Sequence, residues 1–156
     1  MTRIKESLFS IIDDRIEGAT VLDLFAGSGA LGIECISRGA QKTFLVDSSP
    51  EAIKVIKKNT ERMQNFEVIQ KDFMQALKFF SGKQKFDMVF LDPPYDSQMG
   101  EQAIDFIFKN NLLADDGIII FEHTSKKCLP SDSELFIITR SKNYGEKVID
   151  IIAKKD

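Results

Sequence analysis

The chain has 156 residues, of which 43% are hydrophobic, 29% are charged and 13 are Phe. That length and apolar content predict one compact domain over residues 1–156 and exclude global disorder. The sequence has no run of about 20 apolar residues and no apolar leader segment, so we expect neither a membrane span nor a signal peptide. A net charge of −3 argues against nucleic-acid binding driven by bulk charge, so such a role needs a local site.

The two cysteines, Cys35 and Cys128, are too far apart in the sequence to form a metal-type or redox-type motif. Because the chain also has only one histidine, we expect no metal site. Both features favour a reducing, cytoplasmic setting.

Short apolar runs of β type alternate with segments of helical period along most of the chain. This alternation predicts parallel strands joined by right-handed crossovers in a doubly wound sheet. The expected strands are Thr20–Phe25, Thr43–Asp47, Phe66–Gln70, Asp87–Leu91 and Ile118–Glu122, and the expected helices are Ala30–Arg38, Pro50–Met63, Phe73–Phe80 and Glu101–Asn110.

Both ends of the chain depart from this alternation. Residues 2–14 have their apolar side chains on one helical face and predict an amphipathic helix packed on the sheet. Leu135–Thr139 and Lys147–Ala153 predict an antiparallel pair joined around Asn143-Tyr144-Gly145. The expected fold is therefore α/β, with a mostly parallel sheet of about seven strands that ends in antiparallel strands.

A glycine-rich stretch follows the first expected strand. Gly27, Gly29 and Gly32 have the G-x-G-x-x-G spacing, and Asp47 ends the next strand 20 residues after Gly27. This pattern is typical of loops that bind a dinucleotide, with the acidic residue on the ribose hydroxyls. The simpler interpretation is a tight strand-to-helix turn made of small residues.

Asp23, four residues before the first glycine, helps to decide between two kinds of ligand. A carboxylate in the crevice would repel the pyrophosphate of a dinucleotide. It would favour S-adenosylmethionine, which carries a sulfonium and an α-ammonium group, and Asp47 would still suit the ribose. After the third strand, Asp72 could accept the adenine amine or cap the next helix, and Phe73 could supply an N–H group and an apolar wall.

The fourth strand ends in Asp92-Pro93-Pro94-Tyr95, at the edge where open α/β sheets bind ligands. The two prolines fix the backbone and remove N–H donors, which leaves carbonyl oxygens available as acceptors. A carboxylate, a carbonyl and an aromatic ring together suit the exocyclic amine of a nucleobase, because they offer two acceptors and a stacking surface. An ordinary Asp-Pro turn is the alternative.

These features together resemble the amino-directed methyltransferases that use S-adenosylmethionine, which have a Rossmann-like, class I fold. Over nearly the whole chain, the sequence resembles the bacterial family that methylates guanine N2 in 16S ribosomal RNA. The segments that carry this narrower resemblance are Thr2–Phe9, Leu24–Glu34 and Ser37–Ala40. The tetrad alone also occurs in DNA adenine, cytosine-N4 and protein-glutamine methyltransferases, so only the combination is specific.

The resemblance implies that Asp92 and Pro93 hold the target amine and that Tyr95 stacks on the base. It implies ribosomal RNA or the immature small ribosomal subunit as the partner. Family members usually carry a basic, glycine-rich β-hairpin before the segment that starts here at Thr2, and without it we expect weaker unaided affinity for RNA. The implied residues of the S-adenosylmethionine site are Asp23, Phe25, Gly27, Ser28, Gly29, Asp47, Ser48, Asp72 and Phe73.

Two weaker signals lie in the last third of the chain. We expect His123 to be a loop residue after the fifth strand, with contact to the substrate as the alternative. Lys126, Lys127, Arg140 and Lys142 form either a modest phosphate-facing patch or an ordinary solvated surface.

The sequence therefore predicts methyl transfer from S-adenosylmethionine to guanine N2 in 16S ribosomal RNA. Three alternatives stay open. They are the same chemistry on another amine such as adenine N6 of DNA, a nicotinamide-dependent oxidoreductase, and a cofactor-binding partner subunit without catalysis.

Overall fold

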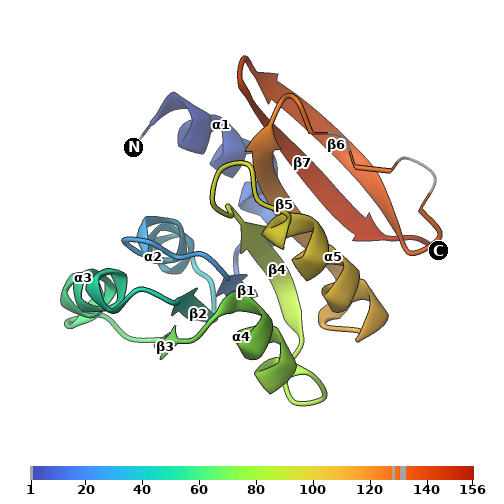
Figure 1. The fold of residues 1–156 in the computed structure, drawn as a ribbon. Helices are drawn as coiled ribbons and strands as arrows, with labels where there is room; N and C mark the ends of the chain where they lie inside the picture. Colours follow the sequence, from blue (N-terminus) through green and yellow to red (C-terminus); the bar gives the residue numbers. More distant parts are fainter. Residues whose placement is uncertain (1, 128, 131–132) are drawn as a thin grey trace.

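The computed structural model describes residues 2–127, 129–130 and 133–156, so Cys128 lies outside the described residues. The elements alternate between helix and strand as the sequence predicts (Figure 1). In chain order they are α1 Arg3–Ile12, the 3-10 helix η1 Asp13–Arg15, β1 Thr20–Asp23, α2 Ala30–Ser37, β2 Lys42–Asp47, α3 Pro50–Thr60, β3 Phe66–Gln70, α4 Phe73–Phe80, β4 Phe86–Leu91, α5 Met99–Lys109, β5 Leu113–Thr124, β6 Phe136–Tyr144 and β7 Lys147–Lys154.

Within the described residues, seven strands form one sheet in the order β3-β2-β1-β4-β5-β7-β6. The strands from β1 to β5 pair in parallel, and β7 pairs antiparallel with β5 and β6. The predicted mixed sheet is therefore confirmed. The strand order reverses between β1 and β4, and open α/β sheets bind ligands at the carboxyl ends of strands at such a point.

Helices cover both faces of the sheet. The helices α4 and α5 pack on one face, where the rings of Phe44, Phe80 and Phe86 meet edge to face at 5.1–5.6 Å between centroids. The helices α1 and α2 cover the other face, with Phe9 of α1 and Cys35 of α2 buried in the same cluster, and α3 packs against β2. None of the described helices is long and apolar enough to cross a bilayer.

Several predicted boundaries were wrong by two or more residues. The strand β1 ends at Asp23 instead of Phe25, because the chain turns there into the glycine loop and Ala26 N donates to Val46 O at 2.8 Å. The helix α3 ends at Thr60 instead of Met63, where Met63 N donates to Thr60 O and closes a turn.

The C-terminal hairpin is longer than the sequence predicts. The strand β6 continues to Tyr144, and the connection to β7 is the two-residue turn Gly145-Glu146 instead of Asn143-Tyr144-Gly145. Gly145 has a φ of +81°, which a glycine adopts without the steric cost of a side chain. At the end of β6, Tyr144 Oη donates to Ser7 Oγ at 2.7 Å and so attaches the hairpin to α1.

Gly32 lets α2 lie close to β2, and this contact generates a first prediction. A Cβ at Gly32 would lie 2.4 Å from Leu45 Cδ2 and 2.7 Å from Thr43 Cγ2. We expect Gly32→Ala to lower the free energy of unfolding by about 1–3 kcal/mol through overpacking, although alanine favours a helix. Urea unfolding measures this, and in a Leu45→Ala background the cost of Gly32→Ala should shrink. Additive effects of the two changes would contradict the assigned contact.

Candidate active site

Asp47 fastens the glycine loop between β1 and α2. Its Oδ2 accepts from Gly27 N at 2.9 Å, and its Oδ1 accepts from Ser49 N at 2.9 Å. Gly27 and Gly29 have φ values of +59° and +84°, which explains glycine at both positions. A Cβ at Gly27 would meet no protein atom within 4 Å, so the loop has open space on that side. Each Asp47 oxygen keeps a lone pair for a ligand hydroxyl.

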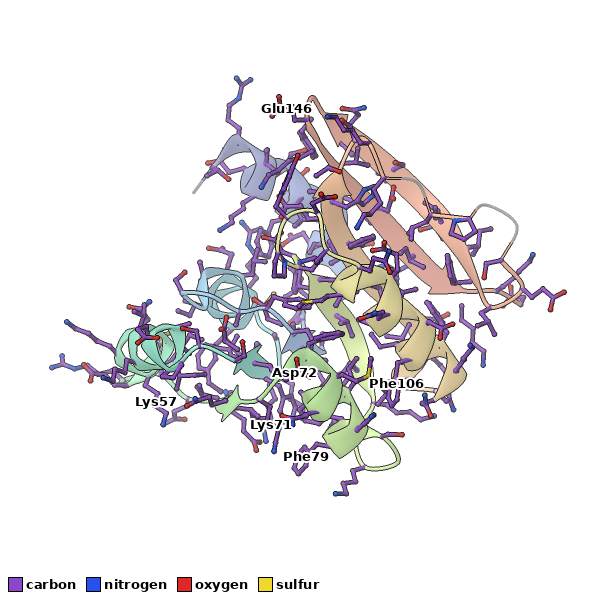
Figure 2. All side chains as sticks on the ribbon, in the orientation of Figure 1. Lys57, Lys71, Asp72, Phe79, Phe106 and Glu146 are labelled. Carbon is purple, nitrogen blue, oxygen red and sulfur yellow. The ribbon has the colours of Figure 1, made fainter. Side chains whose placement is uncertain are left out.

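A cavity of about 390 Å³ lies beside this loop. Asp72 begins α4 there as its N-cap, and its Oδ2 accepts from Met74 N at 3.1 Å and Gln75 N at 3.4 Å. The ring of Phe73 lies 5.5 Å from that of Phe25 and gives the cavity an apolar wall. Figure 2 shows Asp72 and Lys71 at the start of α4, where β3 ends. The lining residues include Phe25, Asp47, Ser48, Asp72, Phe73, Asp92 and Pro93.

Asp23 is the last residue of β1, just before the glycine loop, and is 1% exposed. Neither of its carboxylate oxygens has a hydrogen-bond partner among the described residues. Burial raises its pKa from 3.8 to about 7 and the neighbouring Asp92 adds to the rise, while the nearby backbone N–H of Phe25 and the Lys5 ammonium group offset a part of it. A buried carboxylate without partners is costly in the protein alone, and a cationic ligand would lower that cost.

Asp92 follows β4 at the point where three cavities meet. It lines the cavity beside the glycine loop, a second cavity of about 180 Å³ beside Tyr95, and a third of about 310 Å³ under α1. Loss of hydration raises the pKa of Asp92 from 3.8 to about 6, and the Glu122 carboxylate adds to the rise. The sequence correctly predicted that this carboxylate lies at the carboxyl edge of the sheet.

The rest of the tetrad forms one wall of the cavity beside Tyr95. Pro94 O accepts from Ser97 N at 3.3 Å, whereas Pro93 O accepts no hydrogen bond from the described part of the chain. Tyr95 is 79% exposed, so its ring is open to a stacking partner. The Lys127 ammonium group donates to Ser97 O and holds this loop beside α5.

His123 differs from the expectation of a loop residue. It lies within β5, its side chain is 5% exposed, and its Nε2 is 2.6 Å from Asp150 Oδ2. Burial opposes its charged form, but the Asp150 carboxylate and the Thr124 carbonyl raise the pKa of His123 above its usual value. Since Nδ1 is 2.8 Å from Thr124 O, both ring nitrogens face acceptors and the ring binds best as an imidazolium. The contact with Asp150 joins β5 to β7, and His123 also lines the cavity beside Tyr95.

The expected lysine and arginine patch is divided. Lys127 contacts Ser97 and Glu101, so it belongs to the scaffold of the tetrad loop. Lys126, Arg140 and Lys142 are exposed and separate from that contact.

Three further residues take part in the site, and of these Glu122 and Lys147 were missed from the sequence. Asn59 Nδ2 donates to Ser28 O at 3.0 Å and holds the glycine loop from α3. Glu122 and Lys147 form an ion pair at 3.1 Å next to Asp92. Glu122 could have been identified from the sequence because it ends an apolar strand, at the same edge of the sheet as Asp92.

The strand order and the arrangement of the site first define a class of protein. The chain has the Rossmann-like fold of the class I, S-adenosylmethionine-dependent methyltransferases. A solved structure with this fold, that of yhhF from Escherichia coli, has a TM-score of 0.89 and 29% identity, and covers 99% of this chain and 87% of that one.

The family follows from the sequence comparison. The model of the family described as conserved hypothetical protein 95 matches residues 1–153, and the chain belongs to that family. It is 34% identical over 157 residues to YlbH of Bacillus subtilis (strain 168), covering 98% of this chain and 85% of that protein. It is 36% identical over 131 residues to ribosomal RNA small subunit methyltransferase D of Haemophilus influenzae, and the match covers 81% of this chain and 68% of that protein. The resemblance to small-subunit rRNA methyltransferases is confirmed.

The buried carboxylate generates a second prediction. Because burial raises the pKa of Asp23 from 3.8 to about 7, the folded protein should lose stability as the pH rises through that window. Asp23→Asn should remove this loss and make the protein more stable than wild type by about 1–3 kcal/mol at about pH 8.

Urea unfolding between about pH 5 and pH 8 measures this effect, in the absence of ligand. The same substitution should weaken S-adenosylmethionine binding, which calorimetric titration measures. Parallel pH profiles for the variant and the wild type would contradict the assigned burial cost.

Proposed function

We propose that this protein transfers a methyl group from S-adenosylmethionine to the exocyclic N2 amine of a guanine in small-subunit ribosomal RNA. The observation that carries the proposal is the position of Asp92, which lines both the cavity beside the glycine loop and the cavity beside Tyr95. A carboxylate shared by two adjoining cavities can hold an amine from one side next to a methyl donor on the other.

The residues beside the glycine loop fit the donor. The unpartnered Asp23 carboxylate suits a ligand with positive charge and opposes a pyrophosphate, which favours S-adenosylmethionine over a nicotinamide dinucleotide. Asp47 would bind the ribose hydroxyls, and Asp72 with Phe73 would hold the adenine. Gly27, Ser28 and Gly29 would let the backbone approach the methionine part, and Phe25 and Ser48 would complete the walls.

Asp92 and Pro93 prepare the amine to react. The amine has two N–H groups, which the Asp92 carboxylate and the free Pro93 carbonyl would accept. These contacts turn the nitrogen lone pair, otherwise delocalised into the ring, toward the donor. When bound, S-adenosylmethionine would supply the methyl group from its sulfonium, with the neutral thioether S-adenosylhomocysteine as the leaving group. The methylated nitrogen then releases a proton, and Asp92, with a pKa near 6, can receive it or pass it to water.

The names of relatives support ribosomal RNA as the substrate. Ribosomal RNA small subunit methyltransferase D of Haemophilus influenzae is 36% identical over 131 residues. The exposed Tyr95 ring would stack on the target base, which must be unpaired or turned out of its helix to reach Asp92. With a net charge of −3, we expect the protein to bind a folded or protein-bound RNA site in preference to RNA in general.

A substitution of the shared carboxylate tests the proposed function. Asp92→Ala should reduce methyl transfer by at least about a hundredfold while S-adenosylmethionine affinity stays within about threefold, because the contact acts mainly in the transition state. The measurement is turnover on immature small ribosomal subunits, with identification of the methylated nucleoside, and with cofactor affinity from the same preparations. Asp105→Ala, an exposed carboxylate on α5, is the matched control and should be fully active. Full activity of Asp92→Ala would contradict the mechanism.

A change at Tyr95 tests the stacking role. Tyr95→Ala should weaken capture of the RNA substrate by about 1–3 kcal/mol, whereas Tyr95→Phe should have little effect, because stacking needs the ring and not the hydroxyl. The KM for small subunits reports this, with stability checked by thermal unfolding. Equal losses in Tyr95→Phe and Tyr95→Ala would assign the role to the hydroxyl instead.

A further inference from the structure

An ion pair lies beside Asp92 and has no part in the steps described so far. Glu122 lies on β5 and Lys147 on β7, with Lys147 Nζ 3.1 Å from Glu122 Oε1. Both residues line the cavity beside Tyr95 and the cavity under α1, as Asp92 does. The pair therefore faces the space in which a base stacked on Tyr95 would lie.

The position of Glu122 next to Asp92 is chemically unusual. Two carboxylates at one cleft repel each other, and the single Lys147 ammonium group offsets only part of that repulsion. The two carboxylates suit a ligand that presents N–H donors side by side. The Lys147 ammonium group beside them suits an acceptor on the same ligand.

Bases with an exocyclic amine differ at the ring position next to that amine. Guanine has a protonated N1 beside its 2-amine, and then the O6 acceptor. Adenine and cytosine have an unprotonated ring nitrogen beside the amine, and a carboxylate would repel its lone pair. Of these three bases, only guanine presents two adjacent donors, the 2-amine and the N1–H, followed by an acceptor, O6. This is the order that Asp92, Glu122 and Lys147 require.

We propose that Glu122 and Lys147 select guanine, with Glu122 accepting the N1–H and Lys147 donating to O6. The inference rests on the proposed function, because it takes Asp92 to hold the 2-amine. An ammonium group has three N–H donors, so Lys147 can contact O6 and keep its bond to Glu122. A site built around polar groups rejects an analogue that leaves those groups unpaired.

The test compares guanine with 2-aminopurine at the methylated position. 2-Aminopurine keeps the 2-amine but has an unprotonated N1 and no O6. Small ribosomal subunits are reconstituted with ligated RNA that carries either base, and kcat/KM for methyl transfer is measured on each. The wild type should prefer guanine by at least about tenfold.

Two variants separate the two contacts. In Glu122→Gln the amide N–H can donate to the unprotonated N1, so the preference for guanine should fall at least about fivefold. In Lys147→Met the rate on guanine should fall at least about fivefold, and the rate on 2-aminopurine should not change, because that base has no O6. Glu146→Gln is the matched control, since Glu146 lines the same cavity from the hairpin turn (Figure 2) and should keep the wild-type preference.

The outcomes distinguish this inference from the proposed function. A wild type that methylates guanine N2, with a preference that neither Glu122→Gln nor Lys147→Met changes, would overturn the selection by this pair and leave the proposed function standing. A wild type that methylates neither RNA would overturn both. Thermal unfolding and S-adenosylmethionine affinity, equal in all four proteins, would show that the changes in preference arise at the base and not from altered folding.

Discussion

Alternate residues of a strand face opposite sides of a sheet, and in this protein that rule concentrates negative charge at one edge. Asp23 pairs with Phe90 of β4, and Phe90 pairs with Ile120 of β5. Asp92 and Glu122 each lie two positions beyond those partners, so all three carboxylates share one face. Loss of hydration, with a smaller contribution from repulsion between neighbouring carboxylates, raises the pKa of Asp23 to about 7 and that of Asp92 to about 6. The chemistry proposed for the cleft depends on this unfavourable concentration of charge.

The backbone around these carboxylates is held by contacts from other elements. Asp47 and Asn59 fasten the glycine loop from β2 and α3, and Lys127 fastens the loop after the tetrad. A loop fixed in this way loses little further entropy when a ligand binds, which favours both affinity and accurate positioning. Tyr95, by contrast, projects into solvent with 79% of its surface exposed.

The fold was largely predictable because its signals are local. Apolar runs with intervening helical periods predicted the parallel sheet, and the order of small and acidic residues predicted which loops would face one edge. Strand and helix ends were less accurate, because the end of β1 depends on where Ala26 can bond to Val46 of another strand.

The contacts of His123 and Glu122 could not be predicted, since their partners Asp150 and Lys147 lie 27 and 25 residues away. Such pairs form only when β7 lies antiparallel to β5, and no local pattern encodes that pairing. The sequence did identify the edge of the sheet at which the candidate ligand-binding residues gather.

The hydrogen bond between Ser7 and Tyr144 joins residues separated by 137 positions. Lys5 of the first helix and Lys147 of the last strand both line the cavity under α1, so this cavity is bounded by both ends of the chain. Contacts between distant segments form late in folding, because the loop that they close is long. During synthesis on the ribosome, the cleft is therefore incomplete until β7 has emerged, because Lys147 and Ile149 of that strand line it.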